Sequence, residues 1–216
     1  MTSAAPIRAV ISDFGGVLTT PLFNAFTAWQ RNSGLSFERL GQAMADAGER
    51  HGFHPLYELE KGAVTEAEFL RMLEAELDPG TSLSGMRDVY FDHLEPNPPM
   101  IGLMRDLRER GLRMALLTNN VREWEPQWRA MLPEIDEIFE VVVDSAFVGM
   151  RKPDPEIYRL TLERLGDGLA AGECVFVDDV DVNCEAARSL GMHAVLYQEP
   201  AQTIAEIRAR LEHAPR

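Results

Sequence analysis

Five short apolar segments, separated by helical patterns, constrain the fold of this chain more than any other feature. They cover residues 7–12, 113–118, 140–143, 174–178 and 193–197. Each is rich in β-branched residues or leucine, and most do not alternate with polar residues, which is typical of strands buried on both faces of a parallel sheet. Their alternation with helices through short connections predicts an α/β fold with an open, doubly wound parallel sheet.

Helix signals fill the spaces between these segments. Residues 99–110 carry apolar side chains on one stripe and are followed by Gly111, which is a typical helix stop. Asp154 and Pro155 provide an N-cap acid and a proline for the first turn of a helix that we expect to run to residue 165. Residues 181–190 predict a further helix, closed by a glycine.

Residues 21–96 interrupt this alternation, because they show helical periodicity and no convincing strand. Thr65 and Glu68 have the spacing of a capping box before an apolar run, and the proline-rich residues 95–99 predict a stiff linker. We expect an all-helical cap at 21–96, inserted after the first strand of a core formed by 1–20 and 97–216. Residues 212–216 are expected to be a frayed tail.

Composition excludes several classes of partner. The formal net charge is −14, which repels phosphate backbones and anionic lipid surfaces, so we expect no nucleic-acid or membrane partner. Cys174 and Cys184 are too few for a disulfide scaffold and favour a reduced, cytoplasmic protein. The chain shows no secretory signal and no apolar run near the roughly 18 residues of a membrane span. The oligomeric state is left open.

Polar residues follow the predicted strands where functional sites of doubly wound sheets form, at the carboxyl ends. These residues are Asp13, Thr118, Asn119, Asp178 and Asp179, with Lys152 just beyond the third strand. Taken singly, each is more often a turn former or a solvated charge. The adjacent Asp178 and Asp179, however, repel each other unless a cation lies between them. With Asp13 on a neighbouring strand, they predict a hard, oxygen-coordinated cation.

The order and spacing of four segments resemble the four motifs of the haloacid dehalogenase superfamily. These segments are residues 13–18, 117–120, 151–154 and 176–183. The resemblance covers nearly the whole chain, and it is closest to the branch that includes the N-terminal phosphatase domain of mammalian epoxide hydrolase and bacterial sugar-phosphate phosphatases. It implies a Mg²⁺-dependent phosphohydrolase acting on a small-molecule phosphomonoester, with a sugar phosphate as one option.

The resemblance also assigns a nucleophile and a metal site. Asp13 would attack phosphorus and form an aspartyl-phosphate that water later hydrolyses. Mg²⁺ would be held by the Asp13 carboxylate, the backbone carbonyl of Gly15, the Asp179 carboxylate and waters. Asp178 would lie in the outer shell or orient the lysine, and Asn183 would orient the metal-site carboxylates.

The same resemblance assigns the groups that bind the phosphoryl oxygens. They are the Thr118 hydroxyl, the Asn119 backbone N–H and the Lys152 ammonium. Such donors neutralise charge on the transferring group, which is the main demand of phosphoryl transfer.

Gly15 departs from the family pattern. Most phosphatases of the superfamily carry there a second aspartate that protonates the leaving oxygen and then activates water. Gly15 cannot transfer a proton, so we expect slow turnover or a proton donor from the cap or the substrate. The candidate donors in the cap are His51, His54, Glu58 and Glu60.

Three alternatives stay open. A metal-free 2-haloacid dehalogenase is disfavoured by the intact pair Asp178 and Asp179. A phosphonate hydrolase would need a cap lysine, for which Lys61 is the one candidate, yet Lys61 precedes Gly62 where a helix end favours a cation. The third alternative is a catalytically weak binding or regulatory module, in which Gly15 is the lesion.

Overall fold

The computed structural model describes residues 6–212, and a five-stranded sheet lies at its centre. The strands are β1 (Ala9–Ser12), β2 (Arg113–Thr118), β3 (Val141–Asp144), β4 (Cys174–Asp178) and β5 (His193–Leu196). Their order is β3-β2-β1-β4-β5, and every neighbouring pair is parallel. The predicted α/β fold with a parallel sheet is therefore confirmed, with the strand ends shifted by one or two residues.

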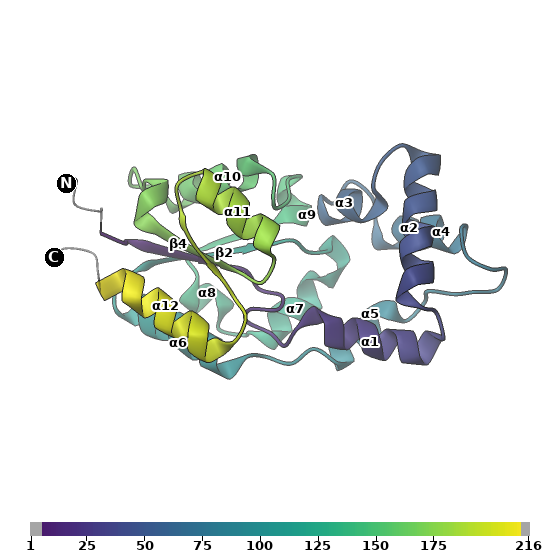
Figure 1. The fold of residues 1–216 in the computed structure, drawn as a ribbon, viewed down its shortest axis with the longest axis horizontal. Helices are drawn as coiled ribbons and strands as arrows, with labels where there is room; N and C mark the ends of the chain where they lie inside the picture. Colours follow the sequence, from purple (N-terminus) through teal and green to yellow (C-terminus); the bar gives the residue numbers. More distant parts are fainter. Residues whose placement is uncertain (1–5, 213–216) are drawn as a thin grey trace.

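Helices cover both faces of the sheet (Figure 1). Against one face pack α6 (Pro98–Glu109), α7 (Glu125–Met131), α8 (Ile135–Ile138) and α12 (Pro200–Glu212). Against the other pack α9 (Ser145–Val148), α10 (Pro155–Leu165) and α11 (Asp181–Ser189). Val10 and Ile11 are both fully buried, one in each layer of core, because successive strand residues point to opposite faces. This explains why the strands read as continuous apolar runs.

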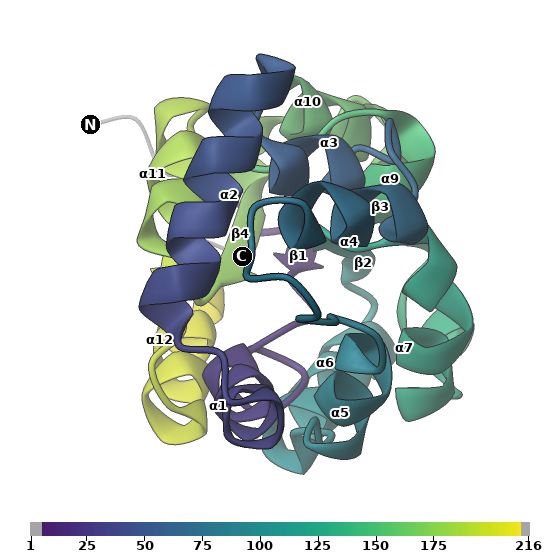
Figure 2. The same ribbon diagram turned by 90° about the vertical axis from the view of Figure 1, so that its right-hand side faces the viewer.

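The segment between β1 and α6 is helical, as predicted. It comprises α1 (Leu22–Ser33), α2 (Phe37–His51), α3 (Pro55–Glu60), α4 (Glu66–Glu74) and α5 (Met86–Asp92). These helices bury a second hydrophobic cluster, which includes Trp29, Leu59, Phe69 and Leu73 and extends to Val121 after β2. Figures 1 and 2 show them beyond the carboxyl ends of the strands. The exact division at residues 21–96 stays a prediction.

The chain leaves the sheet and returns to it through two adjacent segments. Thr19 and Pro96 form an isolated antiparallel bridge, and the Thr20 N–H donates to the Glu95 carbonyl at 2.8 Å. The Asn97 N–H donates to the Leu18 carbonyl, also at 2.8 Å. The proline-rich stretch expected to link the insertion to the core is thus tied to the segment that follows β1.

Two helix starts differ in how they are capped. Thr65 and Glu68 form the predicted capping box, in which each side chain accepts a hydrogen bond from the backbone N–H of the other. Asp154 occupies the N-cap position of α10, but its side chain makes no capping bond, and the helix opens on Pro155. Of the expected tail, Glu212 ends α12, and residues 213–216 lie outside the described part of the chain.

Candidate active site

The carboxyl ends of the three central strands bring the predicted residues together. Asp13 follows β1, Thr118 ends β2, and Asp178 ends β4 with Asp179 next to it. Because β1 lies between β2 and β4, Asp13 sits at the middle of this edge. The carboxylate atoms of Asp13, Asp178 and Asp179 approach within 4.8 Å of one another.

Lys152 lies among these carboxylates. Its Nζ is 2.7 Å from Asp13 Oδ1 and 2.6 Å from Asp178 Oδ2, and the side chain is 1% exposed. Burial would by itself lower the pKa of Lys152, but the two carboxylates outweigh it and raise the pKa above its ordinary value. The charged form of the lysine is therefore favoured, and it places a local positive charge at this edge of an acidic protein.

Asp178 is fully engaged in positioning its neighbours. Its Oδ1 accepts from the Val180 N–H at 2.8 Å and from Asn183 Nδ2 at 3.0 Å. Its Oδ2 accepts from Lys152 and from Asn183 Nδ2, the latter at 3.1 Å. Asp178 is completely buried. With both oxygens bonded within the protein, Asp178 is suited to orient the lysine, whereas Asp13 and Asp179 are better placed to face a ligand.

The charge of Lys152 does not fully offset the effect of burial on the pKa values of Asp13 and Asp179. The pKa of Asp13 is raised to about 7, because burial outweighs the attraction of Lys152 and is reinforced by the charges of Asp178 and Asp179. The pKa of Asp179 is raised to about 6, chiefly by burial and then by Asp178. Carboxylates held together at this cost fit a hard divalent cation, which would restore both to the ionised state.

Two glycines allow this crowding. Gly16 has φ +77°, and a Cβ there would lie 2.2 Å from Asp179 Oδ2, so a side chain is excluded by Asp179 itself. A Cβ on Gly15 would lie 3.2 Å from Leu22 Cδ2. Gly15, where most phosphatases of the haloacid dehalogenase superfamily carry an acid, is therefore covered by the apolar side chain of Leu22 in α1.

Asn119 fixes the loop that carries the lysine. Its Nδ2 donates to the Lys152 carbonyl at 3.0 Å, and its Oδ1 accepts from the Lys152 N–H at 2.8 Å. The side-chain amide thus acts as a clamp between the end of β2 and residue 152, a role the sequence did not indicate. Thr118 is buried beside it at the end of β2.

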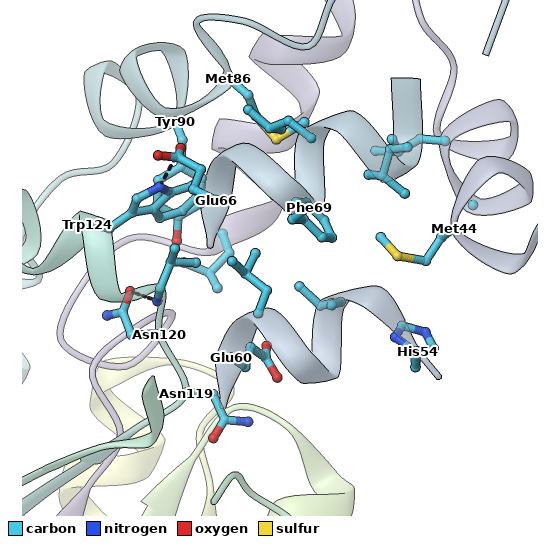
Figure 3. A pocket seen from close by; sticks show the side chains of 18 of the residues that line it. Met44, His54, Glu60, Glu66, Phe69, Met86, Tyr90, Asn119, Asn120 and Trp124 are labelled. Carbon is cyan, nitrogen blue, oxygen red and sulfur yellow. Dashed lines mark hydrogen bonds between the residues drawn. The ribbon is translucent and has the colours of Figure 1, made fainter. Parts of the chain in front are cut away.

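A cavity of about 650 Å³ adjoins these strand ends, between the insertion and the core. In Figure 3 Glu60 and Asn119 lie at one end of it, and Met44, Phe69 and Met86 line its sides. Tyr90 also lines it, and burial followed by the charges of Asp13 and Asp179 raises the pKa of its phenol. The phenol is thus within electrostatic reach of both carboxylates. Tyr90 was not predicted as a site residue, because its segment shows no sequence signal beyond an apolar stripe.

The four candidate proton donors of the insertion separate into two groups. His54 and Glu60 line the cavity. His51 and Glu58 are not among its described lining residues, and Glu58 is paired with Lys61. Burial raises the pKa of Glu60 against the opposing effect of Arg151, whose Nε lies 2.6 Å from Glu60 Oε2.

The comparisons with known proteins agree with this architecture. A model of the haloacid dehalogenase-like hydrolases matches residues 7–191. The chain belongs to this family. It is 30% identical over 210 residues to acyl-CoA dehydrogenase family member 10 of Mus musculus and 28% identical over 218 residues to bifunctional epoxide hydrolase 2 of Sus scrofa. These alignments cover 94% and 93% of this chain, but the chain spans only 19% and 38% of the two relatives.

Other members of the family match along almost their whole length. A sesquiterpene phosphatase of Aspergillus oryzae is 28% identical over 202 residues, which is 93% of this chain and 95% of that protein. A predicted hydrolase of the family from Porphyromonas gingivalis has a TM-score of 0.73 at 22% identity, covering 96% and 98% of the two chains. A Bacteroides thetaiotaomicron family enzyme crystallised with magnesium and inorganic phosphate has a TM-score of 0.69 at 23% identity, covering 89% and 94%. At these identities the structural likeness concerns the fold.

The described helices include none with the length and apolarity needed to cross a membrane.

Proposed function

We propose that this chain hydrolyses phosphomonoesters with the help of Mg²⁺, and that Asp13 is its nucleophile. The observation that carries the proposal is the position of Lys152, which shares its ammonium between Asp13 and Asp178 beside the carboxylate of Asp179. This arrangement combines a nucleophile, a fixed cation for phosphate and a candidate metal site within one edge of the sheet. Family members named as phosphatases support the same reaction class.

The reaction would proceed in two displacements. An Asp13 carboxylate oxygen attacks phosphorus, the ester P–O bond breaks, and the alcohol leaves after gaining a proton. Water then attacks the phosphorus of the aspartyl-phosphate, which releases inorganic phosphate and restores Asp13. Lys152, the Thr118 hydroxyl and the Asn119 N–H would donate to the phosphoryl oxygens throughout.

The donor set fits Mg²⁺, which prefers a few carboxylates, waters and substrate phosphate. Asp13, the Gly15 carbonyl and Asp179 would hold it, and it would supply positive charge to the phosphoryl group when bound. Asp178 and Asn183 would act by fixing the lysine and the adjoining carboxylates.

The direct test measures p-nitrophenyl phosphate hydrolysis by the purified chain, before and after EDTA and with Mg²⁺ restored. We expect activity that EDTA abolishes and Mg²⁺ recovers, and an Asp13→Asn variant that keeps the fold and loses essentially all turnover. Asp154→Asn is the matched control, since Asp154 is exposed and its side chain caps nothing.

Other outcomes discriminate the alternatives. Full activity without metal, or chloride release from 2-chloropropionate, would favour a dehalogenase. Cleavage of phosphonates that requires Lys61 would favour a phosphonate hydrolase. Absence of turnover with all substrates would favour a binding module.

A further inference from the structure

The cavity beside the candidate active site has apolar walls. Its volume of about 650 Å³ falls within the roughly 300–1,000 Å³ of sites that bind small organic molecules. Side chains from α2, α3, α4 and α5 converge on it, among them Met44, Leu59, Phe69 and Met86. Figure 3 shows the labelled members of this set pointing toward a common space.

The two carboxylates that line the cavity already have partners within the protein. Glu60 is paired with Arg151. Glu66 Oε1 accepts a hydrogen bond from Trp124 Nε1 at 2.7 Å, and Glu66 Oε2 lies 3.3 Å from Arg87 Nη1. Among the described lining residues there is no lysine or arginine that would face a ligand. A molecule with several hydroxyl groups would thus lose water here and gain few hydrogen bonds in return.

His54 is the one histidine among the described lining residues of the cavity. Its ring stacks on Tyr57 with centroids 4.0 Å apart. Burial, followed by the nearby charge of Arg151, lowers its pKa, which disfavours the charged form of the ring. At this position the wall therefore offers an aromatic ring to a ligand.

The cavity reaches one of the residues that would bind phosphate. Asn119, whose backbone N–H is a proposed phosphoryl donor, lines it. Leu22 lines it too, and this side chain lies against Gly15. A substrate whose phosphoryl group reaches Asp13 would therefore extend its ester group past Leu22 and Asn119 into the apolar space.

We propose that the substrate is the phosphate monoester of an apolar alcohol, whose long alkyl chain lies in this cavity. The inference rests on the proposed phosphohydrolase function and specifies its substrate class. The phosphate end is recognised by charge, through Lys152. The alcohol end is recognised by removal of its apolar surface from water, which is worth about 0.8 kcal/mol, or about fourfold in binding, for each methylene buried.

The test is a series of n-alkyl phosphates from butyl to decyl, assayed below their critical micelle concentrations, beside glucose 6-phosphate and glycerol 3-phosphate. Primary n-alkanols have nearly the same acidity, so a trend with chain length reports the cavity and not the chemistry of the leaving group. We expect kcat/KM to rise at least about tenfold from butyl to octyl phosphate, with the two polyol phosphates at or below butyl phosphate.

A matched pair of variants locates the effect. Met44→Gln places a polar side chain of similar length on the cavity wall, and Met72→Gln makes the same change on α4 at a half-buried residue that is not among the described lining. We expect Met44→Gln to reduce the octyl-to-butyl ratio of kcat/KM by at least about threefold and Met72→Gln to preserve it.

The outcomes separate the two levels of the argument. If p-nitrophenyl phosphate is hydrolysed but kcat/KM is flat or falls with chain length, or the polyol phosphates are preferred, the apolar substrate class is refuted and the phosphohydrolase function stands. Equal ratios in Met44→Gln and Met72→Gln would refute the role of the cavity. Absence of hydrolysis with every ester would overturn both proposals.

Discussion

Lys152 offers a test of the electrostatic design of the site that needs no substrate. Its ammonium is 1% exposed and lies 2.7 and 2.6 Å from carboxylate oxygens of Asp13 and Asp178. Lys152→Met keeps an unbranched apolar stem and removes the charge, which leaves two buried carboxylates without their cation. Breaking a buried pair in this way costs about 3–5 kcal/mol. In a chain of this size that corresponds to a fall in Tm of roughly 6–20 °C.

The other lysine is the natural control. Lys61 pairs with Glu58 in the insertion, and the side chains are 30% and 24% exposed. An ion pair this open to solvent contributes about 0–1 kcal/mol, so Lys61→Met should shift Tm by less than about 4 °C. Thermal unfolding in EDTA at pH 8 compares the two variants directly. If Lys152→Met lost no more stability than Lys61→Met, the proposed burial and pairing of Lys152 would be wrong.

Two further measurements guard this prediction. The loss caused by Lys152→Met should shrink between pH 8 and pH 5, because Asp13, with a pKa already raised to about 7, takes up a proton and no longer needs the cation. If the single variant does not fold, the double variant Lys152→Met with Asp178→Asn should recover part of the stability, since replacing both partners is far less costly than removing one. A loss that is independent of pH and is not rescued would refute the reasoning.

Three other expectations follow from the site. Asp179→Asn should raise the Mg²⁺ concentration that gives half-maximal activity at least about tenfold without unfolding the chain. A Mg²⁺ titration of p-nitrophenyl phosphate hydrolysis measures this concentration, and an unchanged value would exclude Asp179 as a ligand. Burial raises the pKa of Asp144 to about 6, so this carboxyl binds its proton more tightly in the folded than in the unfolded chain, and its contribution to the free energy of unfolding falls as pH rises from 4 to 7. The Asp144→Asn variant keeps the capping oxygen toward the Ala146 N–H, and its free energy of unfolding in urea should gain up to about 3 kcal/mol on that of the wild-type chain between pH 4 and pH 8. A difference that stays constant with pH would contradict this. With Gly15 in place of an acid, aryl phosphates should be hydrolysed much faster than alkyl phosphates of equal size. If chemistry is rate-limiting and the hydrolysis rate does not depend on the leaving-group pKa, the proton would come from His54 or Glu60.

The strands and the strand-end residues could be predicted because one geometric rule links them. Parallel strands buried on both faces give continuous apolar runs, and their carboxyl ends meet at one edge. Asp13, Asp178 and Asp179 are therefore brought together by topology alone, without knowledge of side-chain packing. Lys152 was placed near this edge by its position just beyond the third strand, and its role came from the resemblance. Its hydrogen bonds with Asn119 had no sequence signal, because they join a side chain to the backbone of a distant loop.

The cavity was beyond prediction for a different reason. Phe69 and Leu73 fall on the apolar stripe expected of α4, yet they both line the cavity and belong to the hydrophobic cluster of the insertion. An apolar stripe in the sequence indicates that the side chains of one helix face avoid water. It does not indicate whether they pack against protein or line a cavity. The helices α8 and α9 were also missed, because four residues are too few to show a helical period.

The tie between the residues on either side of the insertion has an evolutionary consequence. Thr19 and Pro96 form a backbone bridge, and the backbone hydrogen bonds of Thr20 and Asn97 lie next to it. The first and last residues of the insertion are therefore held side by side. Doubling the length of chain between two such fixed ends costs only about 0.6 kcal/mol of closure entropy. A change in the length of the insertion therefore costs little in closure entropy, although Leu22 and Glu60 contact Gly15 and Arg151 near the sheet edge. Selection for new substrates can act on one part of the gene while the reaction chemistry stays encoded in the other.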